Sequence, residues 1–435
     1  MNSLLLAAAL ATQAAAPPIP VPSAAPAPVA APDAAFITCL AALREQAAAQ
    51  GITGETFAQH TGDLRPDPGV LALLDAQPEF TTPLWDYLAA LVDDQRVADG
   101  QAMLAQHRDL LVRVAADYGV DAATVIAVWG VESDYGRVFG NRPLLASLAT
   151  LSCQGRRQPF FRGELFALLR LLQDGDLRGE GLAGSWAGAF GHTQFMPSTY
   201  ARIAVDGDGD GRRDLVASIP DALASTAHYL QRAGWRSGQP WGYEVRVPAD
   251  LDAALAGRTR RQPLSAWRAL GVARMDGAAI ELPADTPAAL LLPTGREGPA
   301  FLVFRNYDAI YAYNAAESYA LAIALLADRL RGGGGLIAAW PTDDPGLGRP
   351  QRRELQALLL ARGHAIGSAD GMIGTLTRRA IQAEQLRLGL QPADGRAGAK
   401  ILRTLQAEAA APIALPAASP APPVPVPARI EEARP

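Results

Sequence analysis

The sequence predicts a mainly α-helical protein that carries a small antiparallel sheet and ends in a separate three-helix module. Three observations support this fold class. Apolar residues recur at helical spacing over most of residues 36–330. One interval of that region instead shows alternation and short apolar runs, which are typical of strands. A run of four glycines and a Pro-containing stretch then precede a compact helical segment.

Six segments have the apolar periodicity of helices. They lie at residues 39–50, 108–119, 121–131, 162–174, 219–235 and 317–331. The third, DAATVIAVWGV, is almost uncharged, so we expect it to be a buried helix.

The interval with strand character lies between the last two of these helices. GYEVRVP alternates polar and apolar residues, AAIELP and AALLLP are short apolar runs, and FLVFRNY is rich in strand-forming residues. These segments, at residues 242–248, 278–283, 288–293 and 301–307, predict a small antiparallel sheet inserted into the helical body.

The composition divides the chain into six parts. MNSLLLAAALATQAAAPP has a short apolar run followed by small residues, which indicates a signal peptide over residues 1–16; an unstructured Ala-rich start is the alternative. We predict a Pro/Ala linker at 17–35, the main domain at 36–330 and a Gly/Pro linker at 331–349. The three-helix module follows at 350–409, and a disordered Pro-rich tail at 410–435.

These features bound the location and the partners of the protein. The apolar run is too short to span a bilayer, and no cysteine follows it, so we expect export to the periplasm without a lipid anchor or a transmembrane segment. The net charge of -5 and the lack of any Lys/Arg block argue against a nucleic-acid partner. The two cysteines, Cys39 and Cys153, could form a disulfide worth ~4–5 kcal/mol in the chain-entropy model. Two buried free thiols are the alternative, and the sequence leaves both open.

Glu132 is a single carboxylate at the end of the apolar segment, just before a Gly-containing turn. A carboxylate in such a place must be paired, exposed, or kept partly protonated. An apolar helix end would raise its pKa towards the working pH of a general acid. A solvated or ion-paired helix end is the alternative, and it would be preferred if Glu132 stood alone.

Three separated motifs favour a catalytic role for Glu132. They are GVESDYGRVFGN at 130–141, GSWAGAFGHTQFMPSTY at 184–200 and YAYNAAESYALAI at 311–323. Together they closely resemble the lytic murein transglycosylase B family of bacterial peptidoglycan-cleaving enzymes, which have a lysozyme-like core. The resemblance covers roughly residues 36–330, with three long motifs in the same order. DGMIGTLTRRAIQAEQ and PADGRAGAKIL in the C-terminal segment resemble the peptidoglycan-binding domain type 1, and a generic helical bundle is the alternative.

The resemblance implies a reaction that needs only one carboxylate. Glu132 would protonate the oxygen between N-acetylmuramic acid and N-acetylglucosamine, and would then take the proton of the muramoyl C6 hydroxyl as it closes a 1,6-anhydro ring. Ordinary glycoside hydrolysis uses two carboxylates. We expect Asp134 to point away from Glu132 and Glu164 to be structural, so no second carboxylate is evident. A hydrolytic muramidase and a non-catalytic peptidoglycan-binding scaffold are the competing interpretations.

The resemblance also implies the residues that bind the sugar. Ser185 would hydrogen-bond the catalytic Glu, Gln194 would line the sugar site, and His192, Met196 and Pro197 would form its wall. In the third motif the implied residues are Tyr313 and Asn314 on the floor of the cleft and Tyr319 near the acid. A core role for the tyrosines is the alternative for any one of them.

An acidic loop, DGDGDGRRDLVASIPDAL at 206–223, resembles a calcium-binding EF-hand loop. Asp206, Asp208 and Asp210 alternate, and Arg212 would offer its carbonyl. Ala217 stands where the bidentate Glu belongs, so a standard loop fails; relatives close a longer loop with a later Asp, which Asp221 matches. We expect a structural Ca²⁺ here, with a solvated acidic turn as the alternative. No cofactor is expected for catalysis. The expected partner is the peptidoglycan glycan strand, bound by a monomer, and the sequence identifies no protein partner.

Overall fold

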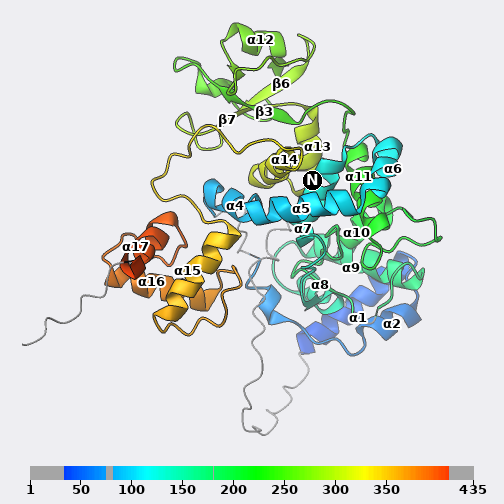
Figure 1. Ribbon diagram of the computed structural model, residues 1–435. Helices are drawn as coiled ribbons and strands as arrows, with labels where there is room; N and C mark the ends of the chain where they lie inside the picture. Colours follow the sequence, from blue (N-terminus) through cyan, green and yellow to red (C-terminus); the bar gives the residue numbers. More distant parts are fainter. Residues whose placement is uncertain (1–33, 75–81, 180, 411–435) are drawn as a thin grey trace, which may run out of the picture.

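The computed structural model describes residues 34–74, 82–179 and 181–410 (Figure 1). The predicted signal peptide, nearly all of the linker at 17–35 and nearly all of the tail at 410–435 therefore lie outside the described residues. Within them the protein is mostly helical with two small antiparallel sheets, one of two strands and one of five, and the sequence predicted the larger one. No helix of the described ranges is both long enough and apolar enough to cross a membrane.

A helical body occupies the first part of the chain and closes with two helices after the sheet (Figure 1). Its elements are α1 (Ala34–Ala49), α2 (Gly54–Thr61), η2 (Pro68–Val70), α4 (Leu84–Leu91), α5 (Asp94–Gln106), α6 (Arg108–Tyr118), α7 (Ala122–Ser133), β1 (Arg142–Pro143), α8 (Leu144–Cys153), α9 (Gln158–Gln173), β2 (Ala183–Gly184), α10 (Pro197–Ile203), α11 (Ile219–Arg232), α13 (Arg305–Asn314) and α14 (Glu317–Leu330). All six predicted helices are present among them.

The five-stranded sheet lies at one end of this body (Figure 1). It contains β3 (Gly242–Arg246), β4 (Gln262–Pro263), β5 (Ala273–Arg274), β6 (Pro287–Leu291) and β7 (Ala300–Val303). Two short helices, η3 (Ala253–Leu255) and α12 (Leu264–Ala269), lie beside it. The strand order is β4-β6-β7-β3-β5, and every pair is antiparallel. Alternate residues of β6 and β7 face opposite sides. Leu291 and Phe301 join the helical core, whereas Leu290 and Leu302 join a second core around Trp267. Burial on both faces explains why the β6 segment is continuously apolar.

Two strand predictions need correction. Residues 278–283, AAIELP, form no strand, although Ile280 is buried in the second core. The segment FLVFRNY is a strand only to Val303, and α13 begins at Arg305. Packing explains the change of backbone, because the fully buried Asn306 donates from its amide to the carbonyl oxygens of Arg236 and Gln239.

The disulfide between Cys39 and Cys153 is present and ties α1 to the end of α8. The two residues are 114 positions apart in the sequence, with their Cα atoms 5.8 Å apart. Of the two alternatives that the sequence left open, the structure contains the disulfide, which fixes α1, the first helix of the described residues, to α8.

The C-terminal module consists of α15 (Arg349–Ala361), α16 (Thr375–Arg387) and α17 (Ala399–Ala410) around a small core of its own. It lies beside the α4 and α5 end of the helical body (Figure 1). The segment before it was expected to be a flexible linker, but it has defined contacts. Leu336 and Trp340 pack against the main core, and the Ala338 amide donates to Glu244 Oε1 at 2.7 Å.

Candidate active site

Helix α7 carries Glu132 into the centre of the helical body. Asp121 caps the start of the helix by accepting a hydrogen bond from the Thr124 amide at 3.1 Å. All residues from Ala123 to Ser133 are buried, and α7 packs against α14, α5, α11 and α6. The helix ends at Ser133, and Asp134, which follows it, adopts the left-handed conformation (φ 52°) and donates from its amide to Gly130 O at 3.1 Å. The predicted buried helix with a carboxylate at its end is therefore present.

Glu132 is only 4 % exposed, and one of its oxygens accepts a hydrogen bond from the Tyr319 hydroxyl of α14. Its other oxygen, Oε2, is buried without a hydrogen-bond partner among the residues that the structure describes. Burial raises the pKa of Glu132 well above its usual range, and the hydrogen bond from Tyr319 opposes this shift. The carboxyl group is thus favoured in its protonated form, with one oxygen left for a ligand.

Tyrosines of α13 and α14 form the wall next to Glu132. The Tyr313 ring stacks on that of Tyr319 with centroids 6.4 Å apart, and the Tyr313 hydroxyl donates to Thr193 O at 2.9 Å. Tyr313 and Tyr319 are nearly fully buried, at 8 % and 1 % exposure. The structure therefore brings the motif at 311–323 and the motif at 184–200 together beside the acid.

Gln194 belongs to the same wall and is held in an uncommon conformation. Its φ of 49° lies in the left-handed region, and its side-chain amide donates to Phe139 O at 3.1 Å and Gly191 O at 2.9 Å. The carbonyl oxygen of the side chain, Oε1, is buried with no hydrogen-bond partner in the described part of the chain. It is an acceptor to which a hydroxyl or amide N–H group of a bound ligand could donate.

Ser185 has a different partner from the one that the resemblance implied. Its hydroxyl oxygen accepts a hydrogen bond from the Ala189 amide at 3.0 Å, and over the described ranges the hydrogen bond to Glu132 comes from Tyr319 instead. Ser185 still lies near the turn after α7, since a Cβ on Gly140 would come within 2.7 Å of its backbone nitrogen. Asn314 is buried at the end of α13, and its implied role in substrate binding stays a prediction.

His192 is hydrogen-bonded to two residues of α7. Its Nδ1 accepts from Trp129 Nε1 at 3.0 Å, and its carbonyl oxygen accepts from the Ser133 hydroxyl at 2.8 Å. Burial lowers the pKa of His192 to about 4, and Asp214 opposes this shift. The neutral ring is packed closely enough that a Cβ on Gly136 would approach it to 2.5 Å. These contacts agree with a wall residue.

The two other carboxylates considered from the sequence are engaged elsewhere. Asp134 forms ion pairs with Arg96 and Arg137 of the body and with Arg349 of the module. Glu164 accepts hydrogen bonds from the Ser198 hydroxyl at 2.7 Å and the Ser198 amide at 2.9 Å. Neither was expected to assist Glu132, and both contact sets are structural.

The acidic loop presents three carboxylates at one point. Oxygens of Asp206, Asp208 and Asp210 lie within 4.8 Å of one another, and Gly211 makes the sharp turn with φ 86°. Asp221 is not part of this group. Its two oxygens accept from the amides of Gly207 at 2.8 Å and Asp214 at 2.6 Å, so that it joins the two ends of the loop.

Sequence reasoning did not find the charged residues around the end of α7. Arg96 is 1 % exposed, and its guanidinium donates to the carbonyl oxygen of Gly130 in the last turn of the helix. An arginine in a polar-looking helix, Asp94–Gln106, gives no sequence signal of such burial. The contact depends on the tertiary packing of α5 on α7.

Comparison with known proteins identifies the family of the chain. Residues 35–328 match the family described as Transglycosylase SLT domain, and residues 348–405 match a peptidoglycan binding domain. The chain belongs to the SLT transglycosylase family. Membrane-bound lytic murein transglycosylase B of Escherichia coli is 32 % identical to it over 277 residues, which cover 58 % of this chain and 72 % of that protein.

Solved structures of the family share the fold. The crystal structure of SltB3 from Pseudomonas aeruginosa in complex with NAG-anhNAM-pentapeptide is 49 % identical, covers 85 % of this chain and 99 % of its own, and has a TM-score of 0.68. The Escherichia coli lytic transglycosylase Slt35 in complex with calcium is 27 % identical, covers 68 % of this chain and 93 % of its own, and has a TM-score of 0.58. The SltB3 match covers a larger share of the chain than the SLT domain, which spans residues 35–328.

Proposed function

We infer that this protein is a lytic transglycosylase that cleaves the MurNAc-(β1→4)-GlcNAc bond of peptidoglycan and leaves 1,6-anhydro-MurNAc ends. The observation that carries the inference is the environment of Glu132. The acid is buried, its pKa is raised, one of its oxygens has no partner among the described residues, and the carboxylates of Asp134 and Glu164 are bound to other groups. The relative SltB3 was solved in complex with NAG-anhNAM-pentapeptide and also with NAG-NAM-pentapeptide, which supports the same substrate class here.

The reaction needs one proton to leave Glu132 and one to return. In the first step the protonated carboxyl group gives its proton to the glycosidic oxygen as the bond from C1 to that oxygen breaks. The carboxylate then accepts the proton of the C6 hydroxyl, whose oxygen bonds to C1. The atoms of the two products sum to those of the substrate, so no water is consumed. The Tyr319 hydroxyl stabilises the carboxylate form between these steps by donating to it.

A Glu132→Gln variant tests the assignment of the acid. We expect release of soluble muropeptides from purified sacculi to fall by at least ~10²-fold, in line with the loss of a general acid. Glu55→Gln provides a control, because Glu55 is an exposed carboxylate of α2 that lies outside the three motifs. If the Glu132 variant retained the parental rate, Glu132 would not be the acid.

We propose that the acidic loop binds a structural Ca²⁺ through carboxylates of Asp206, Asp208 and Asp210, with the Arg212 carbonyl as a further donor. Clustered carboxylate and carbonyl oxygens are the ligands that Ca²⁺ prefers, and Slt35 was solved in complex with calcium. The sequence also predicted Asp221 as a ligand, but its two oxygens accept hydrogen bonds from the amides of Gly207 and Asp214, so we propose that it holds the two ends of the loop together. We expect Ca²⁺ to raise the unfolding temperature of the parent protein but not that of an Asp208→Asn variant. Equal behaviour of the two proteins would contradict the proposal.

We propose that the protein works in the periplasm after export. The disulfide between Cys39 and Cys153 supports an oxidising compartment. Cell fractionation with a probe of thiol accessibility tests this: we expect a disulfide-bonded protein in the periplasmic fraction. A reduced cytoplasmic protein would contradict it.

A further inference from the structure

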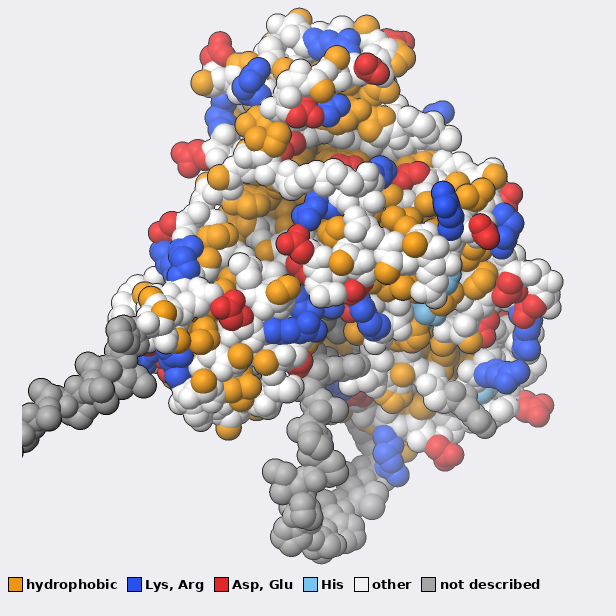
Figure 2. Space-filling model, in the orientation of Figure 1, with side chains coloured by type: hydrophobic (Ala, Val, Ile, Leu, Met, Phe, Trp, Pro, Cys, Tyr) orange, Lys and Arg blue, Asp and Glu red, His pale blue; other side chains and the backbone are white. Residues whose placement is uncertain are grey.

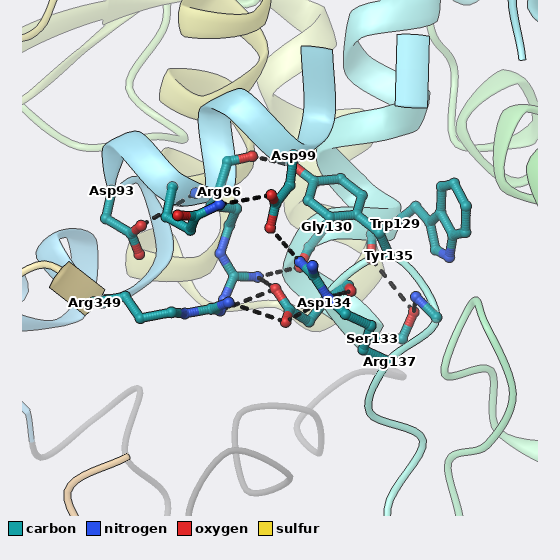
Figure 3. A network of polar contacts seen from close by, with 12 residues as sticks. Asp93, Arg96, Asp99, Trp129, Gly130, Ser133, Asp134, Tyr135, Arg137 and Arg349 are labelled. Carbon is teal, nitrogen blue, oxygen red and sulfur yellow. Dashed lines mark hydrogen bonds and ion pairs between the residues drawn. The ribbon is translucent and has the colours of Figure 1, made fainter. Parts of the chain in front are cut away.

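The end of the catalytic helix is held by a cluster of charged residues that comes from two domains. Asp134, the C-cap residue that directly follows α7, is 7 % exposed. Three arginines surround its carboxylate, two from the helical body and one from the C-terminal module (Figure 3). Glu132 lies two residues before Asp134, so the position of this cap affects the last turn that carries the acid.

Arg96 and Arg137 are the partners from the body. Arg96 binds Gly130 O and lies 3.4 Å from Asp134 Oδ1, while Arg137 Nε donates to Asp134 Oδ2 at 3.0 Å. The Arg137 side chain is 49 % exposed, and its guanidinium also binds Asp99. Neither arginine binds the Asp134 carboxylate in a bidentate manner.

Arg349 supplies that pair from the first residue of α15. Its two terminal nitrogens donate to Asp134 Oδ2 at 3.2 Å and Oδ1 at 3.0 Å, and its side chain is 12 % exposed. Bidentate bonds of arginine to a carboxylate are strong and directional. Burial acts to raise the pKa of Asp134, but Arg96, Arg349 and Arg137 lower it overall, so the carboxylate stays charged at the helix end.

A second arginine of the module, Arg396, also binds the helical body and helps to hold Arg349 in place. Arg396 binds both oxygens of Asp86 in α4 at 2.6 Å, and it also pairs with Asp344 of the connecting segment. Gly346 fits against α4, where a Cβ would approach the Asp86 Cα to 2.7 Å. Basic side chains gather where the module meets the helical body in Figure 2. The module is therefore docked on the body by two Arg–Asp pairs.

We propose that Arg349 is a positioning residue for Glu132, so that the docked peptidoglycan-binding module completes the catalytic site in addition to binding the wall. The proposal rests on the proposed function of Glu132. It means that the chain's own module sets the geometry of the last turn of α7 through Asp134. Undocking of the module would then slow the chemical step even on substrates that need no anchoring.

The test uses the full chain and short soluble glycan strands, on which anchoring to an insoluble wall gives no advantage. We expect Arg349→Gln to lower kcat about tenfold, because a small displacement of an acid has a large effect on rate, with KM within about twofold of the parent. Arg349→Lys keeps the positive charge but cannot form the bidentate hydrogen bonds of the guanidinium, so it should recover part of the lost kcat. Arg379→Gln, an exposed arginine of α16, is the matched control and should behave as the parent.

Two further readouts separate a positioning role from other effects. Hydrogen exchange of amides at 130–138 should be faster in Arg349→Gln than in Arg379→Gln, whether or not the parent is active. An Asp134→Asn/Arg349→Gln double variant should lose no more kcat than the worse single variant, because Arg349 acts on Glu132 only through Asp134. Parental kcat and exchange in Arg349→Gln, a loss confined to KM, or additive losses would each overturn the inference. An inactive parent would instead refute the proposed function, and the exchange result would still decide the inference.

Discussion

Removal of the Cys39–Cys153 disulfide gives a prediction whose size follows from the structure. The bond spans 114 residues of sequence. In the chain-entropy model a closed loop of this length restricts the unfolded chain enough to stabilise the fold by about 5 kcal/mol. At 2–4 °C per kcal/mol for a large domain, the double variant Cys39→Ala/Cys153→Ala should unfold roughly 10 °C or more below the parent.

Thermal unfolding with and without a reducing agent measures this effect. The reductant should lower the midpoint of the parent towards that of the double variant and leave the variant unchanged. Activity at low temperature should be retained, because α1 and α8 contribute neither Glu132 nor the side chain that binds it. The reasoning would be refuted by a parent whose midpoint is the same in both conditions.

Two more predictions concern the acid itself. Tyr319→Phe removes the hydrogen bond that favours the Glu132 carboxylate, so the pKa of Glu132 should rise further. The basic limb of the pH profile of kcat/KM should therefore move to higher pH, and kcat should fall. A basic limb at the same pH as in the parent would contradict the contact. The raised pKa of Glu132 also means that the folded protein holds a proton that the unfolded chain releases at about pH 4.3. Stability is therefore lost as pH rises from that value through the folded-state pKa, by ~1.4 kcal/mol per unit of pKa difference. Glu132→Gln should remove this loss. In urea unfolding the variant should be more stable than the parent at neutral pH but not at pH 4. A gain in stability that is the same at both pH values would contradict the raised pKa of Glu132.

Local patterns predicted the elements well where a pattern and the packing agree. DAATVIAVWGV is apolar on all sides, and α7 is buried on all sides. In FLVFRNY the pattern failed after Val303, because buried hydrogen bonds of Asn306 support a helix start that strand propensity does not reveal. In AAIELP the apolar residues fill a core without forming a ladder.

The site was predictable to the extent that its residues lie in motifs. Tyr319 was expected near the acid, and the structure gives its hydroxyl to Glu132. The resemblance gave Ser185 that hydrogen bond, but the structure pairs its hydroxyl with the Ala189 amide. The pair between Arg349 and Asp134 joins residues 215 positions apart and follows from the docking of two domains. Spacing along the chain holds no information on such a contact.

The mass of the products released from purified peptidoglycan sacculi tests the central claim most directly. The account predicts muropeptides that are one water lighter than those released by a hydrolytic muramidase, with no free reducing end, because the C6 hydroxyl takes the place of water. Products of full mass with reducing ends would show that water attacks C1, and would contradict the single-acid mechanism assigned to Glu132.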